Sequence, residues 1–161
     1  MSERPIELPA ETDFLDPRSQ DLDERHAMRM FLGKTPEQAE AMFQQNFLFY
    51  QEDLLYMRSA AFRFYVVPAL RYLLTDAADG DADAGSTFCS VLEDRAAKEP
   101  DALRPLAPLL AEGIAQILAR FDRFDCDPDI YGDVPARYRA LSSAIEQRAS
   151  SVDGHSPTEQ K

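Results

Sequence analysis

The chain has 161 residues, 45% of them hydrophobic, which fits one domain whose core needs no disulfide or metal. It carries 29 acidic and 17 basic residues, for a formal net charge of −12. Because nucleic acids and anionic membranes attract basic proteins, this charge argues against both. It either serves solubility alone or attracts a basic protein partner.

Residues 1–18 are predicted to form an extended acidic arm, because Pro5, Pro9 and Pro17 lack a backbone donor. This segment has neither the basic start nor the apolar run of a signal peptide. We see no apolar stretch that approaches the roughly 18 residues of a membrane span. Cys89 and Cys126 match no metal-ligand spacing. These features predict a cytoplasmic protein with reduced thiols.

Two helices are predicted next, on either side of Gly33. The first covers residues 19–32 and ends at Gly33, a residue typical of helix C-termini. The second begins with Thr35 as the N-cap, followed by Pro36 at the first helical position. Gln38 stands three residues after Thr35, which is the spacing of a capping box.

The middle of the chain is rich in aromatic residues, with nine of the sixteen between positions 43 and 72. We expect two helices here, over residues 50–58 and 60–74. The second has apolar residues on all sides, so it should be central in the fold or buried against another chain. Pro68 should bend it by removing one hydrogen bond. A homodimer formed through residues 60–74 is therefore a further prediction.

Residues 75–85 are predicted to form a loop, with Ser86 capping a helix that ends before Pro100. An amphipathic helix follows over residues 105–121, and a last helix includes residues 134–145. Residues 151–161 are polar and predict a flexible tail. The prediction is an all-α fold, a compact bundle of six or seven helices around the aromatic-rich helix. It forms one helical domain over residues 19–150.

The sequence argues against an enzyme, because its catalytic inventory is small. His26 and His155 are the only histidines, and His155 lies in the predicted tail. No serine or cysteine lies in a turn typical of nucleophiles. We predict no cofactor, since no cofactor-binding motif is present.

Two groups of aspartates are candidates for binding a hard cation through oxygen. They are Asp76, Asp79, Asp81 and Asp83, and Asp122, Asp125, Asp127, Asp129 and Asp133. Neither completes a calcium loop, so solvated turns are the main interpretation. Asp125, Asp127 and Asp129 are the candidate metal ligands.

Charged residues in the aromatic middle form a second candidate site, made of Asp53, Tyr56, Arg58 and Arg63. A buried charge without a partner is costly, so we expect an ion pair of Asp53 with Arg63 or Arg58. This pair either fixes how two helices pack or forms a polar spot in an aromatic ligand pocket.

Three segments carry a resemblance to a known type of protein: FLGKTPEQAE at residues 31–40, YQEDLLYM at 50–57 and AFRFY at 61–65. They resemble an uncharacterised bacterial all-helical family of no assigned function. The resemblance covers residues 30–140 and implies a bacterial source and a compact helical fold. It implies no catalytic residue.

Two functional hypotheses follow from the sequence. The first is a non-enzymatic acidic interaction protein, an immunity-type antidote that binds a basic protein partner. The alternative is a small-molecule or divalent-metal binding protein, or an enzyme, that uses the aromatic pocket or the aspartate clusters.

Overall fold

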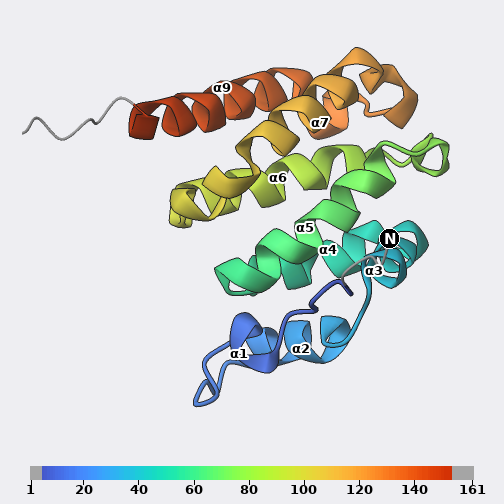
Figure 1. The fold of residues 1–161 in the computed structure, drawn as a ribbon. Helices are drawn as coiled ribbons and strands as arrows, with labels where there is room; N and C mark the ends of the chain where they lie inside the picture. The colour runs from blue at the N-terminus through green and yellow to red at the C-terminus, as the bar shows by residue number, and fades with distance from the viewer. Residues whose placement is uncertain (1–4, 154–161) are drawn as a thin grey trace, which may run out of the picture. The chain divides into compact units, whose positions relative to one another are not determined.

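The computed structural model describes residues 5–153, and within this range it contains nine α-helices, four 3-10 helices and no strand (Figure 1). The predicted all-α fold is confirmed. Two of the nine, α1 (Glu11–Phe14) and α8 (Pro128–Tyr131), have four residues each. The seven longer helices match the predicted number. The described residues group into two compact units, unit 1 up to Asp79 and unit 2 from Gly80 onward. The division into an arm, one domain over residues 19–150 and a tail stays a prediction.

Unit 1 is organised around α5 (Ser59–Leu73), which contacts α1, α3 (Pro36–Gln45) and α4 (Phe47–Leu55). Helix α2 (Leu22–Phe31) contacts α1 and α4, and the 3-10 helix η1 (Asp76–Ala78) follows α5. Nine residues of α5 are buried, Pro68 among them. The aromatic-rich helix is therefore in the interior, as its apolar circumference predicts.

The core of unit 1 consists largely of aromatic rings that touch one another. The Phe31 ring lies 5.0 Å from that of Tyr65 and 5.7 Å from that of Phe43, centroid to centroid. Tyr65 is fully buried, and its hydroxyl lies 2.8 Å from the carbonyl oxygen of Phe31 and 2.9 Å from that of Lys34. This contact ties the turn between α2 and α3 to α5.

The local signals around that turn are confirmed. Gly33 has a φ of +79°, a conformation that favours glycine. Thr35 Oγ1 accepts from the Gln38 N–H at 3.2 Å, and Gln38 Oε1 accepts from the Thr35 N–H at 2.9 Å. The predicted capping box is thus complete, because each partner satisfies a backbone donor of the other.

Three boundaries in unit 1 differ from the prediction. The segment 1–18 is not extended throughout, because α1 forms in it and Phe14 and Leu15 are buried. Helix α2 starts at Leu22, with Asp21 as its N-cap, instead of at residue 19. Helix α4 starts at Phe47 because Asn46 caps it by accepting from the Phe49 N–H. Short polar side chains at positions 21 and 46 therefore set the helix starts.

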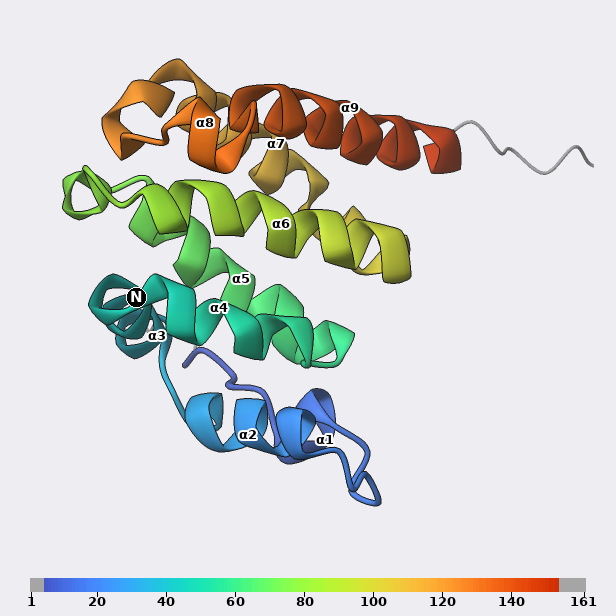
Figure 2. The same cartoon turned by 180° about the vertical axis from the view of Figure 1, so that it is seen from behind.

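Unit 2 contains α6 (Ala82–Lys98), α7 (Ala107–Ala119), α8 and α9 (Val134–Asp153). The 3-10 helices η2 (Pro100–Ala102), η3 (Arg104–Leu106) and η4 (Phe121–Phe124) lie between them. Helix α9 contacts both α6 and α7, and Figures 1 and 2 show it running beside them. Of the predicted tail, residues 151–153 belong to α9, and residues 154–161 lie outside the described range.

The start of α6 corrects the sequence prediction. The helix begins at Ala82 with Asp81 as the N-cap, whereas Ser86 was expected to cap it. Ser86 is instead buried inside the helix. Gly85 lies inside it as well, where an added Cβ would come within 2.9 Å of the Phe124 side chain. The absent side chain lets Phe124 pack against the helix, so tertiary packing offsets the poor helix propensity of glycine.

One stretch of the described residues, Pro100–Ala119, is apolar and long enough by composition to be a candidate membrane span. By composition alone, this stretch differs from the expectation that no apolar stretch approaches the length of a membrane span. In the structure this stretch divides into η2, η3 and α7. Helix α7 has 13 residues, a length of roughly 20 Å against a hydrocarbon core of about 30 Å.

Candidate functional site

The charged residue buried in the aromatic middle, Asp53, is paired with a histidine. Its side chain is 6% exposed, and Oδ1 lies 2.8 Å from Nδ1 of His26, which is 39% exposed. The expected ion pair with Arg58 or Arg63 is therefore wrong. His26 is 27 residues away in sequence, but it directly precedes Ala27, which starts the buried stripe of α2. Its position beside the buried face of α2 is the sequence feature that could have identified His26 as the partner.

The carboxylate of Asp53 is held at a cost in free energy. Burial raises its pKa, and this effect outweighs the lowering by the hydrogen bond and the charge of His26. Its second oxygen, Oδ2, is buried and has no hydrogen-bond partner among the described residues. An ionised carboxylate can only accept hydrogen bonds. Asp53 therefore favours the tautomer of neutral His26 that carries its proton on Nδ1, and in this tautomer Nε2 is an acceptor.

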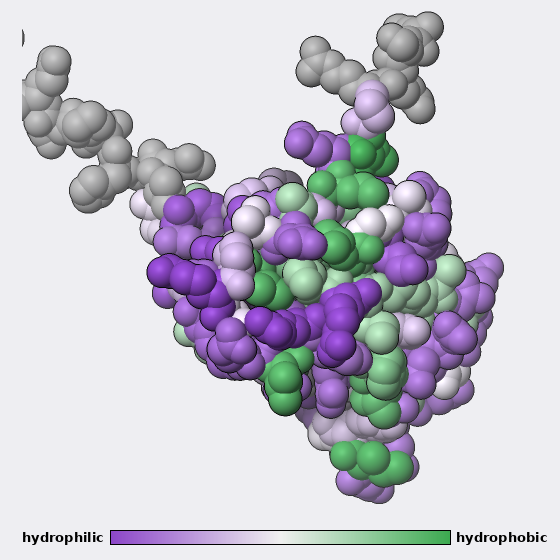
Figure 3. All heavy atoms as spheres, turned by 90° about the horizontal axis from the view of Figure 1, so that it is seen from below, coloured by the Kyte–Doolittle hydropathy of each residue, from purple (hydrophilic) through white to green (hydrophobic). Residues whose placement is uncertain are grey.

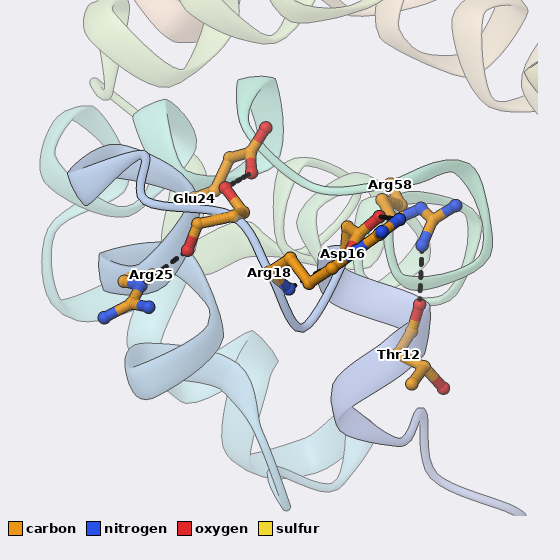
Figure 4. Close-up of polar contacts among 7 residues, drawn as sticks. Thr12, Asp16, Arg18, Glu24, Arg25 and Arg58 are labelled. Carbon is orange, nitrogen blue, oxygen red and sulfur yellow. Dashed lines mark hydrogen bonds and ion pairs between the residues drawn. The ribbon is translucent and has the colours of Figure 1, made fainter.

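The other three residues of this predicted site take separate roles. Arg58 Nη1 lies 3.4 Å from the carbonyl oxygen of Thr12, and Figure 4 shows this contact. Arg63 is half-buried on α5. Tyr56 is 41% exposed at the end of α4, where its N–H donates to the Asp53 carbonyl. The structure thus joins Asp53 to His26 rather than to the predicted arginines.

In unit 2, the fold brings together two aspartate-rich segments. The Gly80 N–H donates to the Arg123 carbonyl at 2.7 Å, and Cys126 Sγ lies 3.3 Å from the Ala82 carbonyl. Tyr131 Oη donates to Asp83 Oδ1 at 3.1 Å. We name the result the acidic cluster, which consists of Asp81, Asp83, Asp122, Asp125, Asp127, Asp129 and Asp133. All but Asp81 are exposed, and Figures 1 and 2 show both segments at the same end of unit 2.

The ionisation of two neighbouring side chains reports the negative field of this cluster. The pKa of the Cys126 thiol is raised to about 11 by burial and then by the charges of Asp83, Asp125 and Asp81. The pKa of Tyr131 is raised, first by its hydrogen bond to Asp83. Burial raises the pKa of Cys89 to about 12. Both thiols are therefore mainly protonated at neutral pH, which is the less reactive form of a cysteine.

The three predicted metal ligands lie in the acidic cluster on one turn. Asp127 Oδ1 accepts from the Asp129 N–H at 2.9 Å as the N-cap of α8. Asp125 has a φ of +55°, which aspartate tolerates better than most residues. Among the described residues, no group of three or more His, Cys, Asp or Glu side chains is arranged to hold a metal ion. Binding by Asp125, Asp127 and Asp129 stays a prediction.

Four basic side chains of unit 2 pair with carboxylates outside the acidic cluster. Arg95 pairs with Glu99 and Lys98 with Asp94 on α6. Arg104 pairs with Asp101, and Arg137 of α9 pairs with Glu93. Pairing of these four cations with other carboxylates leaves them less able to neutralise the aspartates of the cluster.

Comparison with known proteins gives no match: no family model, no curated protein and no solved structure matches this chain.

Proposed function

We propose that this protein is a non-enzymatic interaction protein that binds a basic protein partner through the acidic cluster of unit 2. The observation that carries the proposal is the meeting of two aspartate-rich segments, more than 30 residues apart in sequence, on one exposed surface. A concentrated negative surface attracts a basic partner and speeds the encounter. An immunity-type antidote, which masks a basic toxin, is the specific form that we propose.

The net charge and the two cysteines also support a binding role rather than a catalytic one. The net charge of −12 adds a long-range attraction for a basic protein and repels phosphate backbones. Both thiols have raised pKa values. The proposal also includes a bacterial source and a cytoplasmic location, where cysteines stay reduced.

The test compares two variants with the same net charge. Asp125→Asn, Asp127→Asn and Asp129→Asn together remove three charges from the acidic cluster. Asparagine tolerates the left-handed backbone at position 125 and caps helices as well as aspartate does, so the fold should be kept. The matched control changes three exposed acidic residues elsewhere, Glu7, Glu112 and Glu146, to glutamine.

Each immobilised protein is incubated with an extract of the native cell at low and at high salt. We expect the wild type and the control to retain a basic protein at low salt, and the Asp→Asn variant to lose it. High salt should release the partner, because the screening length of surface charges shortens from about 8 Å at physiological ionic strength to about 3 Å at 1 M. The proposal fails when no basic protein is retained at low salt, or when all three proteins retain it equally.

The alternative is a small-molecule or divalent-metal binding protein, or an enzyme. The observation that favours it is the His26–Asp53 pair, in which a buried carboxylate orients a half-exposed imidazole. Such a pair is a common support for a general base or a metal-bound histidine. Thermal-shift measurements with divalent cations and metabolites test this, because a ligand specific for the folded state raises Tm. A shift that is lost in His26→Gln supports the alternative, and a flat screen counts against it.

A further inference from the structure

Helix α1, the loop that follows it and one face of α2 line a groove with a volume of about 340 Å³. Its apolar wall consists of Leu15, Pro17, Leu22 and Met28. Leu22 is 77% exposed, although it is a large apolar side chain. Figure 3 looks onto α1 and α2 and shows hydrophobic side chains lying between strongly hydrophilic ones. The groove therefore offers apolar surface that a ligand could remove from water.

The charged residues of the groove are Arg25, Arg29 and Glu11. Arg25 and Arg29 stand four residues apart, on the same face of α2 as Leu22. Like charges at this spacing destabilise a helix, and an anion between them would relieve the repulsion. Among the described residues, neither arginine forms an ion pair. The lining of the groove thus carries two positive side chains and one negative one, in a protein of net charge −12.

The loop holds Arg25 in place. Its Nε donates to the Ser19 carbonyl at 2.9 Å, and Ser19 Oγ donates to Glu24 Oε2 at 2.5 Å. Asp16 fixes the start of the loop by accepting from the Arg18 N–H at 2.8 Å, which also lowers the pKa of Asp16. Figure 4 shows these contacts around the turn. A side chain that is already oriented loses less entropy when it binds an anion.

We propose that this groove binds a small amphipathic anion, with its apolar body against Leu22 and Met28 and its anionic group between Arg25 and Arg29. The volume lies at the lower end of the range for small-molecule sites, about 300–1,000 Å³. The net charge of −12 repels an acidic macromolecule at long range, whereas a small monoanion is repelled far less. Glu11 weakens the site, because its carboxylate faces the same groove.

The experiment is a titration of the full chain with octanoate, followed by two-dimensional ¹H–¹⁵N NMR. Octylammonium, which has the same chain length and the opposite charge, is titrated in parallel. We expect octanoate to give saturable shifts in residues 11–29 and octylammonium to give none there. The charge reversal separates recognition of an anion from non-specific binding to apolar surface.

Two variants and one control locate the anionic group. Arg25→Gln with Arg29→Gln should weaken octanoate binding at least about tenfold, because two charge-assisted contacts are lost. Glu11→Gln should tighten binding. The control, Arg18→Gln, changes a 91% exposed arginine of the same loop that does not line the groove. It should leave Kd unchanged within about twofold.

Glutamine is a good helix former, so the double variant should keep its fold, and the amide spectrum reports this directly. Arg29→Gln alone preserves the Arg25–Ser19 contact and should still weaken binding. Three outcomes overturn the proposal: no saturable shift up to the solubility limit, equal binding of octylammonium, or equal weakening by Arg18→Gln. Failure here leaves the proposed function untouched, because the acidic cluster consists of other residues in unit 2.

Discussion

Units 1 and 2 each bury a tyrosine that donates to a backbone carbonyl, but they build the surrounding core differently. Tyr65 bonds to the turn before α3, and Tyr138 Oη lies 2.6 Å from the Gly85 carbonyl in α6. The fully or nearly fully buried aromatic residues of unit 1 are Phe14, Phe31, Phe43, Phe47, Phe62, Tyr65 and Tyr72, and those of unit 2 are Phe88, Phe124 and Tyr138. Unit 1 is thus filled by contacts between rings, whereas unit 2 is filled mainly by aliphatic side chains.

The largest expected effect tests this contrast in the two cores. Phe31→Ala removes a ring that contacts those of Phe43, Tyr50 and Tyr65, and should lower the free energy of unfolding by roughly 3–5 kcal/mol. Leu110→Ala in α7 removes a fully buried aliphatic side chain and should cost roughly 2–5 kcal/mol. We expect the Phe31 variant to lose more, because ring contacts add to the buried area. Denaturant unfolding measures both, and an equal or smaller loss for Phe31→Ala contradicts the contrast.

The next largest losses of stability are expected when either of two glycines is replaced by alanine, and the physical reasons differ. Gly85→Ala places a Cβ within 2.9 Å of Phe124 in a packed interior, so it should cost about 1–3 kcal/mol despite the higher helix propensity of alanine. Gly33→Ala meets no atom within 4 Å, but its φ of +79° should cost about 1–2 kcal/mol. Phe124→Ala separates the two causes, because it removes Cγ, the Phe124 atom that lies 2.9 Å from the added Cβ. In that background the penalty of Gly85→Ala should shrink, while that of Gly33→Ala should not change.

These glycines also show what the sequence could predict. Gly33 was recognised as a helix end, and Thr35 with Gln38 as a capping box, because both signals act within four residues. The sequence predicts a loop at Gly85, and this is wrong because the contact that favours glycine within the helix, with Phe124, joins segments 39 residues apart. No local pattern contains that contact.

The same distinction applies to the candidate sites. The need of Asp53 for a partner followed from its apolar surroundings, but the identity of the partner did not, since His26 lies on another helix. Both aspartate-rich segments were recognised from composition. Their meeting in the acidic cluster depends on contacts such as Tyr131–Asp83, which span 48 residues. The residue types were visible in the sequence, whereas the packing that unites them was not.

A smaller effect is expected at the two buried tyrosines. Tyr65→Phe and Tyr138→Phe each remove a hydrogen bond and should each cost about 0.5–1.5 kcal/mol at neutral pH. Burial raises the pKa of Tyr65 from 10.0 to about 12. In the wild type, stability should therefore fall as pH rises from 10 towards 12, because the unfolded chain releases its proton first. Urea unfolding at neutral pH and near pH 11 checks both statements. If the stability of Tyr65→Phe falls with pH as steeply as that of the wild type, the proposed role of Tyr65 in this pH dependence is wrong.

The smallest expected effect is the change in the free energy of unfolding when Asp53 is neutralised. Its sign should be opposite to that for the neutralisation of Glu99 in unit 2. Burial raises the pKa of Asp53 above 3.8, so the unfolded chain ionises first and stability falls as pH rises through that region. Asp53→Asn removes this penalty together with a charge-assisted hydrogen bond. At neutral pH we expect the variant to be within about 1 kcal/mol of the wild type or more stable.

The matched change in unit 2 is Glu99→Gln. Glu99 is 45% exposed and pairs with Arg95, which is 8% exposed, so neutralising it weakens the support of a buried cation. This variant should be less stable than the wild type at neutral pH, by up to about 1 kcal/mol because the exposed carboxylate is screened by solvent.

Thermal unfolding at pH 4 and pH 7 compares Asp53→Asn with Glu99→Gln. Relative to the wild type, Asp53→Asn should gain stability between these pH values, since only the wild type ionises a buried carboxyl there. A loss over the same interval would mean that the His26 contact outweighs the burial of the Asp53 charge.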